Sequence, residues 1–321
     1  MRSLVLALAL YLLAAGGSPL GAQEWPSHTV TIIVPFLAGS TPDSLARILA
    51  DGLQQRHGVP FVVENRAGAS GNTGTAAVAK AVPDGHTLGV SIVGPLVINA
   101  LLFPKMPYET DKDIAPISIL ASQPSVLVVS PGVADGVESL LAAIKSAPDK
   151  YTYGSIGRGS LSHLAMASLA LKAGVNLVHL PIPGSPATVT ALLRGDVQMA
   201  VLPAGSIVAL SAAGKLRALA VTSPQRSPLL PALPTLREAG VAGVEADAWV
   251  GLIAPAGTSE PVLAKIHQQI VLVLGSEAVV EKLKAQLMVP IASSPAAFKA
   301  LLREEHDRWA PIIAAGGIKA E

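Results

Sequence analysis

The chain has 321 residues, of which 50% are apolar and only 3% aromatic, and its formal net charge is +1. With 14% charged residues and almost no net charge, it lacks the basic patch that nucleic-acid binding requires, so we exclude that class of partner. It contains no cysteine, which excludes both a disulfide framework and a lipid anchor attached through an N-terminal cysteine.

The first 22 residues have the pattern of a secretory signal peptide. Arg2 precedes an apolar run from Leu4 to Ala15, too short for a membrane span, and small residues follow up to Ala22. We therefore expect cleavage after Ala22 and export to a bacterial periplasm in soluble form. Loss of Arg2 leaves 22 of the 23 basic residues against 22 acidic ones, a neutral mature chain long enough for two domains.

A strand, a small-residue loop and a helix come next. Val30 to Val34 is a β-branched apolar run of strand length, and Ser40 or Thr41 can cap the helix that follows the loop. The free N–H groups of such a helix can bind an anion, and ligands collect at the carboxyl ends of strands in open sheets. Ordinary β-α packing is the alternative. We expect Asp43, in the first helical turn, to serve the helix end and not a ligand.

Further strand-loop-helix units follow this first one. Phe61 to Glu64 is a predicted strand, and the glycine-rich loop from Asn65 to Gly74 leads into a short helix, Thr75 to Ala81. Leu88 to Val93 is a third predicted strand. Such repeated units predict an α/β fold with a mainly parallel sheet.

Ile117 to Ala121 is a further predicted strand, and a second α/β series begins after Gln123 and Pro124. Its predicted strands span residues 126–129, 151–154, 177–180, 197–202 and 216–221, with helices between them. An extended loop, residues 223–235, then leads to a strand from Ala248 to Ala254 and to three C-terminal helices, which we expect to pack back on one domain. We predict a first domain of residues 23–124 plus 246–321, a second of residues 125–245, and a hinge near Ser122 and Asp247.

The stretch from Tyr153 to His163 repeats the loop of the first domain. A strand runs into three interleaved glycines, a Ser cap and a helix. Two such helix N-termini facing across a cleft would suit a ligand with a carboxylate at each end. Arg158 could add a bidentate contact and His163 a hydrogen bond, although an exposed Arg and a structural His are the alternatives.

Enzyme signatures are missing from the sequence. It has no Gly-x-Ser-x-Gly elbow, no complete dinucleotide fingerprint and no phosphate-binding loop. Its seven histidines show no metal-ligand spacing. We therefore predict no catalysis, no cofactor and no metal site.

An ordered series of motifs along the chain resembles one family. The series is Ile33-Val34-Pro35-Phe36 with Asp43, Val63-Glu64-Asn65-Arg66, Pro83-Asp84-Gly85, Gly159-Ser160 with His163, Arg217 to Thr222, Leu233-Pro234-Thr235, Glu238-Ala239-Gly240 and Ala254 to Thr258. In these motifs the sequence is similar to the extracytoplasmic substrate-binding proteins of tripartite tricarboxylate transporters, called Bug receptors.

The resemblance implies a two-domain type II periplasmic binding fold that closes on its ligand about a hinge. It implies a small organic carboxylate as ligand and membrane permease subunits as partners. We also expect a monomer without a cofactor. The binding residues that it implies are Phe36, Ala38, Gly39, Ser40, Thr41, Ala69, Ser70, Gly71 and Asn72 on one wall, and Ser155, Gly157, Arg158, Gly159, Ser160, His163, Pro181, Gly184 and Ser185 on the other.

Three departures from the family pattern bear on the ligand. Ser40 stands where a second glycine is usual, Arg158 where a small or amide residue is usual, and Ile182-Pro183 where Tyr-Lys is usual. We interpret them as favouring a carboxylate with a more apolar body, such as an aromatic acid. A sensor subunit that presents its bound form to a membrane kinase, or a two-domain α/β enzyme, are the alternative functions.

Overall fold

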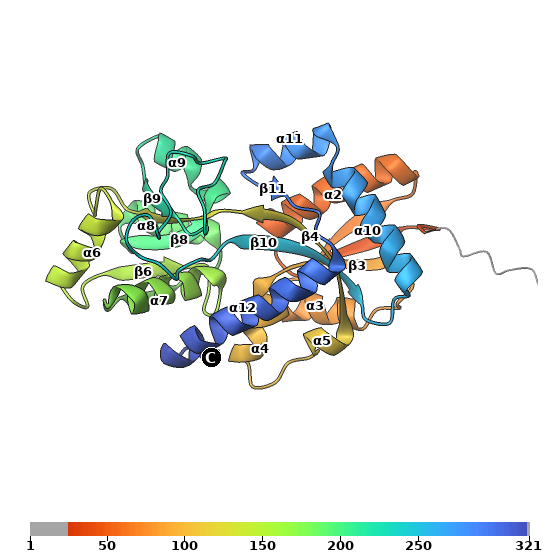
Figure 1. Ribbon diagram of the computed structural model, residues 1–321, viewed down its shortest axis with the longest axis horizontal. Helices are drawn as coiled ribbons and strands as arrows, with labels where there is room; N and C mark the ends of the chain where they lie inside the picture. The colour runs from red at the N-terminus through yellow and green to blue at the C-terminus, as the bar shows by residue number, and fades with distance from the viewer. Residues whose placement is uncertain (1–24, 320–321) are drawn as a thin grey trace, which may run out of the picture.

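The structure is a computed structural model that describes residues 25–319, so the predicted signal peptide lies outside the described residues. The chain forms two lobes that lie side by side, each built on one β-sheet with helices against it (Figure 1). The long strands β4 and β10 lead from one lobe toward the other (Figure 1).

Lobe 1 contains a six-stranded sheet with the order β11-β4-β10-β3-β1-β2. Its strands are β1 (Val30–Val34), β2 (Phe61–Asn65), β3 (Thr87–Ile92), β4 (Ile114–Gln123), β10 (Ala248–Pro255) and β11 (Val289–Pro290). β1 pairs in parallel with β2 and β3, whereas β10 runs antiparallel to both β3 and β4. The predicted strands of this half are therefore present, with β11 as an addition.

Helices pack on both faces of this sheet. They are α2 (Thr41–His57), α3 (Asn72–Ala79), α4 (Asn99–Leu102), α5 (Thr110–Asp113), α10 (Glu260–Leu274), α11 (Glu277–Ala285) and α12 (Pro295–Ala315), with the short turns η1 (Ala69–Gly71) and η2 (Gly94–Ile98). The apolar stripes of α2 and α10, with Leu49 and Ile270 fully buried, pack with strand residues such as Ile32 in one core. The other face belongs to a second core that includes Phe298 of α12.

Lobe 2 contains a five-stranded sheet with the order β7-β6-β8-β5-β9. Its strands are β5 (Ser125–Val129), β6 (Thr152–Ser155), β7 (Val178–Pro181), β8 (Met199–Pro203) and β9 (Arg217–Val221); its helices are α6 (Val137–Ser146), α7 (Leu161–Ala173), α8 (Ser185–Arg194) and α9 (Val208–Ala212), with the turn η3 (Ala204–Ser206). β6 pairs in parallel with β7 and β8, and β5 runs antiparallel to β8 and β9.

The prediction of a mainly parallel sheet is wrong, because both sheets are mixed. β4 carries the chain out of lobe 1 and β10 brings it back, so these neighbouring strands must run in opposite directions. In lobe 2, β5 and β9 are the entering strand and the last strand, and they too are antiparallel. Crossovers through helices produce parallel pairs only inside each lobe.

Thr222 links the two crossing segments. Thr222 follows β9, and its hydroxyl lies 3.2 Å from the carbonyl oxygen of Ser125 and 3.1 Å from that of Ala246. β4 ends at Gln123 in one sheet and β5 begins at Ser125 in the other. These positions support the predicted domain boundaries, which stay a prediction.

The last helix contacts both lobes, although the sequence led us to expect it on one. α12 packs against β4, η2 and α4 of lobe 1 and also against α7 of lobe 2. Phe298 meets Trp249 of β10 edge to face, with ring centroids 5.4 Å apart. In Figure 1, α12 runs from lobe 1 toward the underside of lobe 2.

Between residues 25 and 319, no single helix is long and apolar enough to cross a membrane. α10 and α11 meet the length and composition criteria only as a pair, and the pair is bent by 72°.

Candidate functional site

The loop between β1 and α2 is held at both ends by side chains of lobe 1. Asp43 Oδ2 accepts a hydrogen bond of 2.8 Å from the N–H of Gly39, and Asn65 Nδ2 donates one of 3.0 Å to the carbonyl of Phe36. Gly39 has a φ of 81°, a conformation that glycine adopts without strain. The loop therefore has a defined shape at the carboxyl end of β1.

Both carboxylate oxygens of Asp43 accept hydrogen bonds from residues of lobe 1. Its carboxylate also receives hydrogen bonds from Asn65 Nδ2 at 2.9 Å and from Arg47 Nε at 3.1 Å. Burial raises the pKa of Asp43, but the hydrogen bonds from Arg47, Gly39 and Asn65 outweigh burial and hold the pKa below its ordinary value. These contacts support the structural role that the sequence suggested.

Ser40 occupies the N-cap position of α2 but does not cap the helix with its side chain. Its hydroxyl oxygen is buried and has no hydrogen-bond partner within the described part of the chain. The side-chain cap that we expected from Ser40 or Thr41 is therefore not made, and the Asp43 carboxylate accepts the N–H of Gly39 in the preceding loop. A buried hydroxyl without a partner costs about 1–3 kcal/mol until a polar group reaches it.

The second loop of lobe 1 consists of residues 69–71, which have positive φ angles of 46°, 55° and 93°. Ala69 and Ser70 are exposed, whereas Asn72 at the start of α3 is buried. Asn99 Nδ2 donates to Asn72 Oδ1 at 2.6 Å and lies 3.1 Å from the carbonyl of Ser70. The amide oxygen of Asn72 is therefore engaged inside lobe 1, and the exposed part of this loop is its backbone with the Ser70 side chain.

The corresponding loop of lobe 2 joins β6 to α7. Gly157 and Gly159 have φ angles of 132° and 73°, and Ser160 caps α7 by accepting the N–H of His163 at 3.3 Å. The cap predicted here is therefore confirmed. The His163 side chain also binds the loop, since its Nδ1 accepts a hydrogen bond of 3.0 Å from the N–H of Gly159. This hydrogen bond gives the His163 ring a structural role in the loop.

Three rings stack beneath this loop. The imidazoles of His163 and His179 have centroids 3.8 Å apart and planes inclined by 10°, and Tyr153 lies 4.8 Å beyond His179. His179 Nε2 is 2.8 Å from Ser155 Oγ. His179 was not among the predicted site residues, because its contact with Tyr153 depends on the parallel register that places the two residues opposite each other in β6 and β7.

Both imidazoles are neutral at pH 7. Burial lowers the pKa of His163 to about 3, with the neighbouring His179 ring and the positive charge of Arg158 adding to the effect. Burial and Arg158 lower the pKa of His179 to about 4. The exposed Arg158 therefore supplies the positive charge of this loop, while the two rings supply hydrogen bonds and packing.

The β7–α8 loop lies beside the β6–α7 loop. The N–H of Ile182 donates to Ser155 O at 3.0 Å, and the N–H of Gly184 donates to Ile156 O at 3.4 Å. Ile182 is partly buried against the core of lobe 2. Ile182 therefore does not offer an open apolar surface to a ligand. It supports the interpretation of an apolar ligand less than the sequence suggested.

Lobe 1 touches the lobe-2 loop at Gly159. A Cβ atom on Gly159 would lie 2.3 Å from Leu102 Cδ1 of α4, so the glycine permits this close approach. The β6–α7 loop therefore faces lobe 1.

The structure thus gathers the expected residues into two groups. Phe36, Ala38, Gly39, Ser40, Thr41, Ala69, Ser70, Gly71 and Asn72 lie at the carboxyl ends of β1 and β2, and Ser155, Gly157, Arg158, Gly159, Ser160, His163, Pro181, Gly184 and Ser185 lie at the carboxyl ends of β6 and β7. That both groups contact one ligand stays a prediction. A separate hollow in lobe 2 includes none of them and is lined by Pro131, Gly132, Asp135, Ser211, Gly214, Leu216 and Arg217.

Comparison with known proteins identifies similar chains. Residues 45–318 match the family described as "Tripartite tricarboxylate transporter family receptor". Protein BugT of Bordetella pertussis is 34% identical over 322 residues, covering 99% of each chain. Among solved structures, R. palustris Rpa4515 with adipate is 32% identical with a TM-score of 0.86, covering 92% of this chain and 99% of its own. MatC from Rhodopseudomonas palustris with bound malate is 31% identical with a TM-score of 0.80, covering 90% and 100%.

Proposed function

Because the chain belongs to the receptor family of tripartite tricarboxylate transporters, we propose that it is a periplasmic binding protein for a small organic carboxylate. It takes up the ligand between its lobes and delivers it, as a monomer, to the membrane subunits of such a transporter. The family match over residues 45–318 carries this proposal. The adipate and malate in two similar structures support a carboxylate as the class of ligand.

The geometry of the two loop groups supports the same class of ligand. The N-termini of α2 and α7 stand behind the two loops, and each offers backbone N–H groups and the positive end of a helix dipole. In lobe 1 the buried hydroxyl of Ser40 has no hydrogen-bond partner among the described residues and could bind a polar group of the ligand. In lobe 2 the exposed guanidinium of Arg158 could bind a carboxylate. A ligand with a carboxylate at each end matches these two groups.

The alternative functions have less support. The family and its similar structures are binding proteins, which favours a receptor over a two-domain enzyme. The same match favours delivery to a transporter over presentation to a sensor kinase. We expect the exported chain to begin after Ala22, which N-terminal sequencing of the periplasmic protein would test.

A ligand screen tests the proposal directly. We expect adipate, malate or an aromatic acid such as benzoate to raise the thermal unfolding midpoint of the purified protein, because binding to the folded state alone stabilises it. Glucose and glycinamide, which carry no carboxylate, serve as comparisons. Stabilisation by these two compounds and by none of the carboxylates would contradict the proposal.

Arg158 allows a sharper measurement with the carboxylate that binds. We expect Arg158→Gln to weaken its affinity at least about tenfold, because a charge-assisted hydrogen bond is lost. Arg194→Gln, an exposed change at the end of α8 in the same lobe, is the matched control and should bind as the wild type does. Isothermal titration calorimetry gives both constants, and equal affinity of the two variants would exclude Arg158 from the site.

A further inference from the structure

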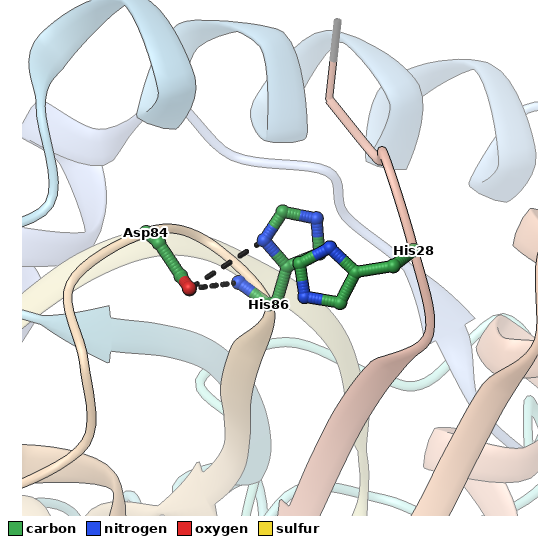
Figure 2. A group of neighbouring side chains, drawn as sticks. All are labelled: His28, Asp84 and His86. Atoms are coloured by element: carbon green, nitrogen blue, oxygen red, sulfur yellow. Dashed lines mark hydrogen bonds and ion pairs between the residues drawn. The ribbon is translucent and has the colours of Figure 1, made fainter. Parts of the chain in front are cut away.

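Two of the seven histidines meet at the end of lobe 1 that faces away from the ligand loops. His28 precedes β1 and His86 precedes β3, and these strands run in parallel, so both residues lie at the amino ends of the sheet. Asp84 belongs to the turn before His86. One potential ligand atom from each of the three side chains lies within 4.8 Å of the other two (Figure 2).

We propose that His28, Asp84 and His86 form a binding site for a divalent transition-metal ion of the Zn²⁺ class. Two imidazoles and one carboxylate are ligands that Zn²⁺ accepts in tetrahedral sites, with water in the fourth position. Mg²⁺ and Ca²⁺ prefer sites made of oxygen ligands, so the donor set discriminates against them. The site is independent of the proposed carboxylate binding, since about five residues of strand, roughly 17 Å, separate the two ends of β1.

The scaffold around the three side chains is rigid on the His86 side. Trp25 is buried, and its indole N–H donates to Gly85 O at 2.8 Å, which ties the N-terminal segment to the turn. The N–H of Thr31 donates to His86 O at 2.8 Å, and the N–H of His86 donates to Asp84 Oδ1 at the same distance. The backbone therefore holds the two histidines and the aspartate next to each other without a metal.

One nitrogen of His86 is directed at the proposed ion position. His86 Nδ1 is buried and makes no hydrogen bond to any described residue, although it lies 3.5 Å from Asp84 Oδ1. The His86 side chain is only 12% exposed, whereas 47% of the Asp84 side chain is exposed, so an ion could approach from the Asp84 side. Figure 2 shows this nitrogen facing the carboxylate, with the His28 ring beside it.

Ser27 can orient both imidazoles from behind. Its hydroxyl lies 3.0 Å from His28 Nδ1 and 3.2 Å from His86 Nε2. A hydroxyl oxygen has two lone pairs, so it can accept an N–H from each ring and leave His28 Nε2 and His86 Nδ1 unprotonated for the metal. This arrangement gives up the 3.2 Å contact in which the Ser27 N–H donates to His86 Nε2.

Metal binding also requires a small movement of His28. The two rings are stacked with centroids 3.6 Å apart and planes inclined by 9°, and parallel rings cannot both direct a lone pair at one ion. His28 and Asp84 are exposed and can rotate, closing separations of up to 4.8 Å toward the roughly 3.3 Å between tetrahedral zinc ligands. The ion would then link the segment before β1 to the turn before β3.

Calorimetric titration of ZnCl₂ into the chelator-treated protein, purified without a polyhistidine tag, tests the proposal. We expect binding of one Zn²⁺ per chain and no heat with MgCl₂. His28→Gln and His86→Gln should each lower the association constant at least about tenfold, and ZnCl₂ should raise the thermal midpoint of the wild type but not of His28→Gln. His28 is exposed, so its variant should fold even if His86→Gln does not.

His306→Gln is the matched control, because His306 Nδ1 also lies near a carboxylate, 3.2 Å from Asp307 Oδ1, on an exposed part of α12. This variant should bind Zn²⁺ as the wild type does. The proposal is overturned if the wild type binds no stoichiometric Zn²⁺, if His28→Gln binds it unchanged, or if His306→Gln loses it equally.

Discussion

The sequence alone indicates the role of some residues at the two loops but not of others. Asp43 lies in the first turn of α2, and that position was enough to suggest a structural role, which three hydrogen bonds and the ion pair with Arg47 now support. Ser40 stands at the cap position by sequence, yet its hydroxyl caps nothing. No sequence motif around His179 indicates its role, since its partners, Tyr153 and Ser155, belong to the neighbouring strand β6.

Gly39 offers a test at the residue scale with a close control. Gly39 and Gly58 have φ angles of 81° and 72°, and a Cβ atom would meet nothing within 4 Å at either. Alanine at each position should cost a similar 1–2 kcal/mol, roughly, in free energy of unfolding, because both must keep a left-handed conformation. We expect Gly39→Ala to weaken carboxylate binding and Gly58→Ala to leave it unchanged.

Denaturant unfolding and calorimetric titration of both variants check this expectation. The positive φ angle means that a bulkier change such as Gly39→Val would also strain the fold, so alanine separates binding from stability better. Unaltered affinity in Gly39→Ala would place the ligand away from the β1–α2 loop.

The positions of helices and strands can be predicted from local sequence patterns, whereas the pairing of the strands cannot. β1, β2 and β3 and helices α2, α10 and α12 occur where apolar periodicity predicts them, because burial of one helical stripe or of a short β-branched run is visible in the sequence. The antiparallel course of β10 between β3 and β4 is not visible, since strand direction depends on how the chain crosses between lobes. The contact of α12 with α7 is not visible in the sequence either, because it depends on how the two lobes are placed side by side.

The docking of α12 on β10 depends on one glycine. A Cβ atom on Gly251 would lie 2.2 Å from Cζ of the buried Phe298, so Gly251→Ala must displace the ring. We expect a loss of about 1–3 kcal/mol in free energy of unfolding, as for other overpacked cores. Urea unfolding measures it, with Gly94→Ala, where a Cβ would meet nothing within 4 Å, as the control.

A second change separates overpacking from backbone strain. In the Gly251→Ala background, Phe298→Leu should cost less than it does in the wild type, because the smaller side chain relieves the clash. Additive effects of the two substitutions would show that the glycine is needed for another reason.

Two acidic groups with raised pKa values, Asp247 and Glu305, lie on the segments that connect the lobes. Asp247 directly precedes β10, and its Oδ1 is buried without a hydrogen bond to any residue from 25 to 319. Burial raises the pKa of Asp247 to about 6, with Glu305 adding to the rise and Ser223 and Arg308 opposing it. Burial likewise raises the pKa of Glu305, which accepts a hydrogen bond from Trp309 Nε1 at 2.5 Å.

The raised pKa of Asp247 predicts a pH dependence of stability. Because the folded value exceeds the unfolded one, the folded chain binds more protons between about pH 4 and pH 6, and stability declines as the pH rises through that range. Asp247→Asn removes this dependence. At pH 7.5 we expect the variant to be more stable than the wild type by up to about 3 kcal/mol, and at pH 4 we expect the difference to shrink to about 0.5 kcal/mol.

Unfolding by guanidinium chloride at the two pH values measures the difference. Asp51→Asn, a change at an exposed position of α2, is the control and should show no pH-dependent gain. A destabilised Asp247→Asn at pH 7.5 would mean that the ionised carboxylate is needed between the lobes.

The sequence by itself determined the family, the α/β class, most strands and helices, and the two loops that form the candidate site, because motifs, periodicity and turn residues are local properties of a chain. Only the tertiary structure decided the mixed direction of both sheets, the stack of Tyr153, His163 and His179, and the meeting of His28 with His86. The strand directions depend on how the chain crosses between the lobes, and the ring contacts depend on which strands pair, so residues far apart in sequence meet without any periodic signal along the chain.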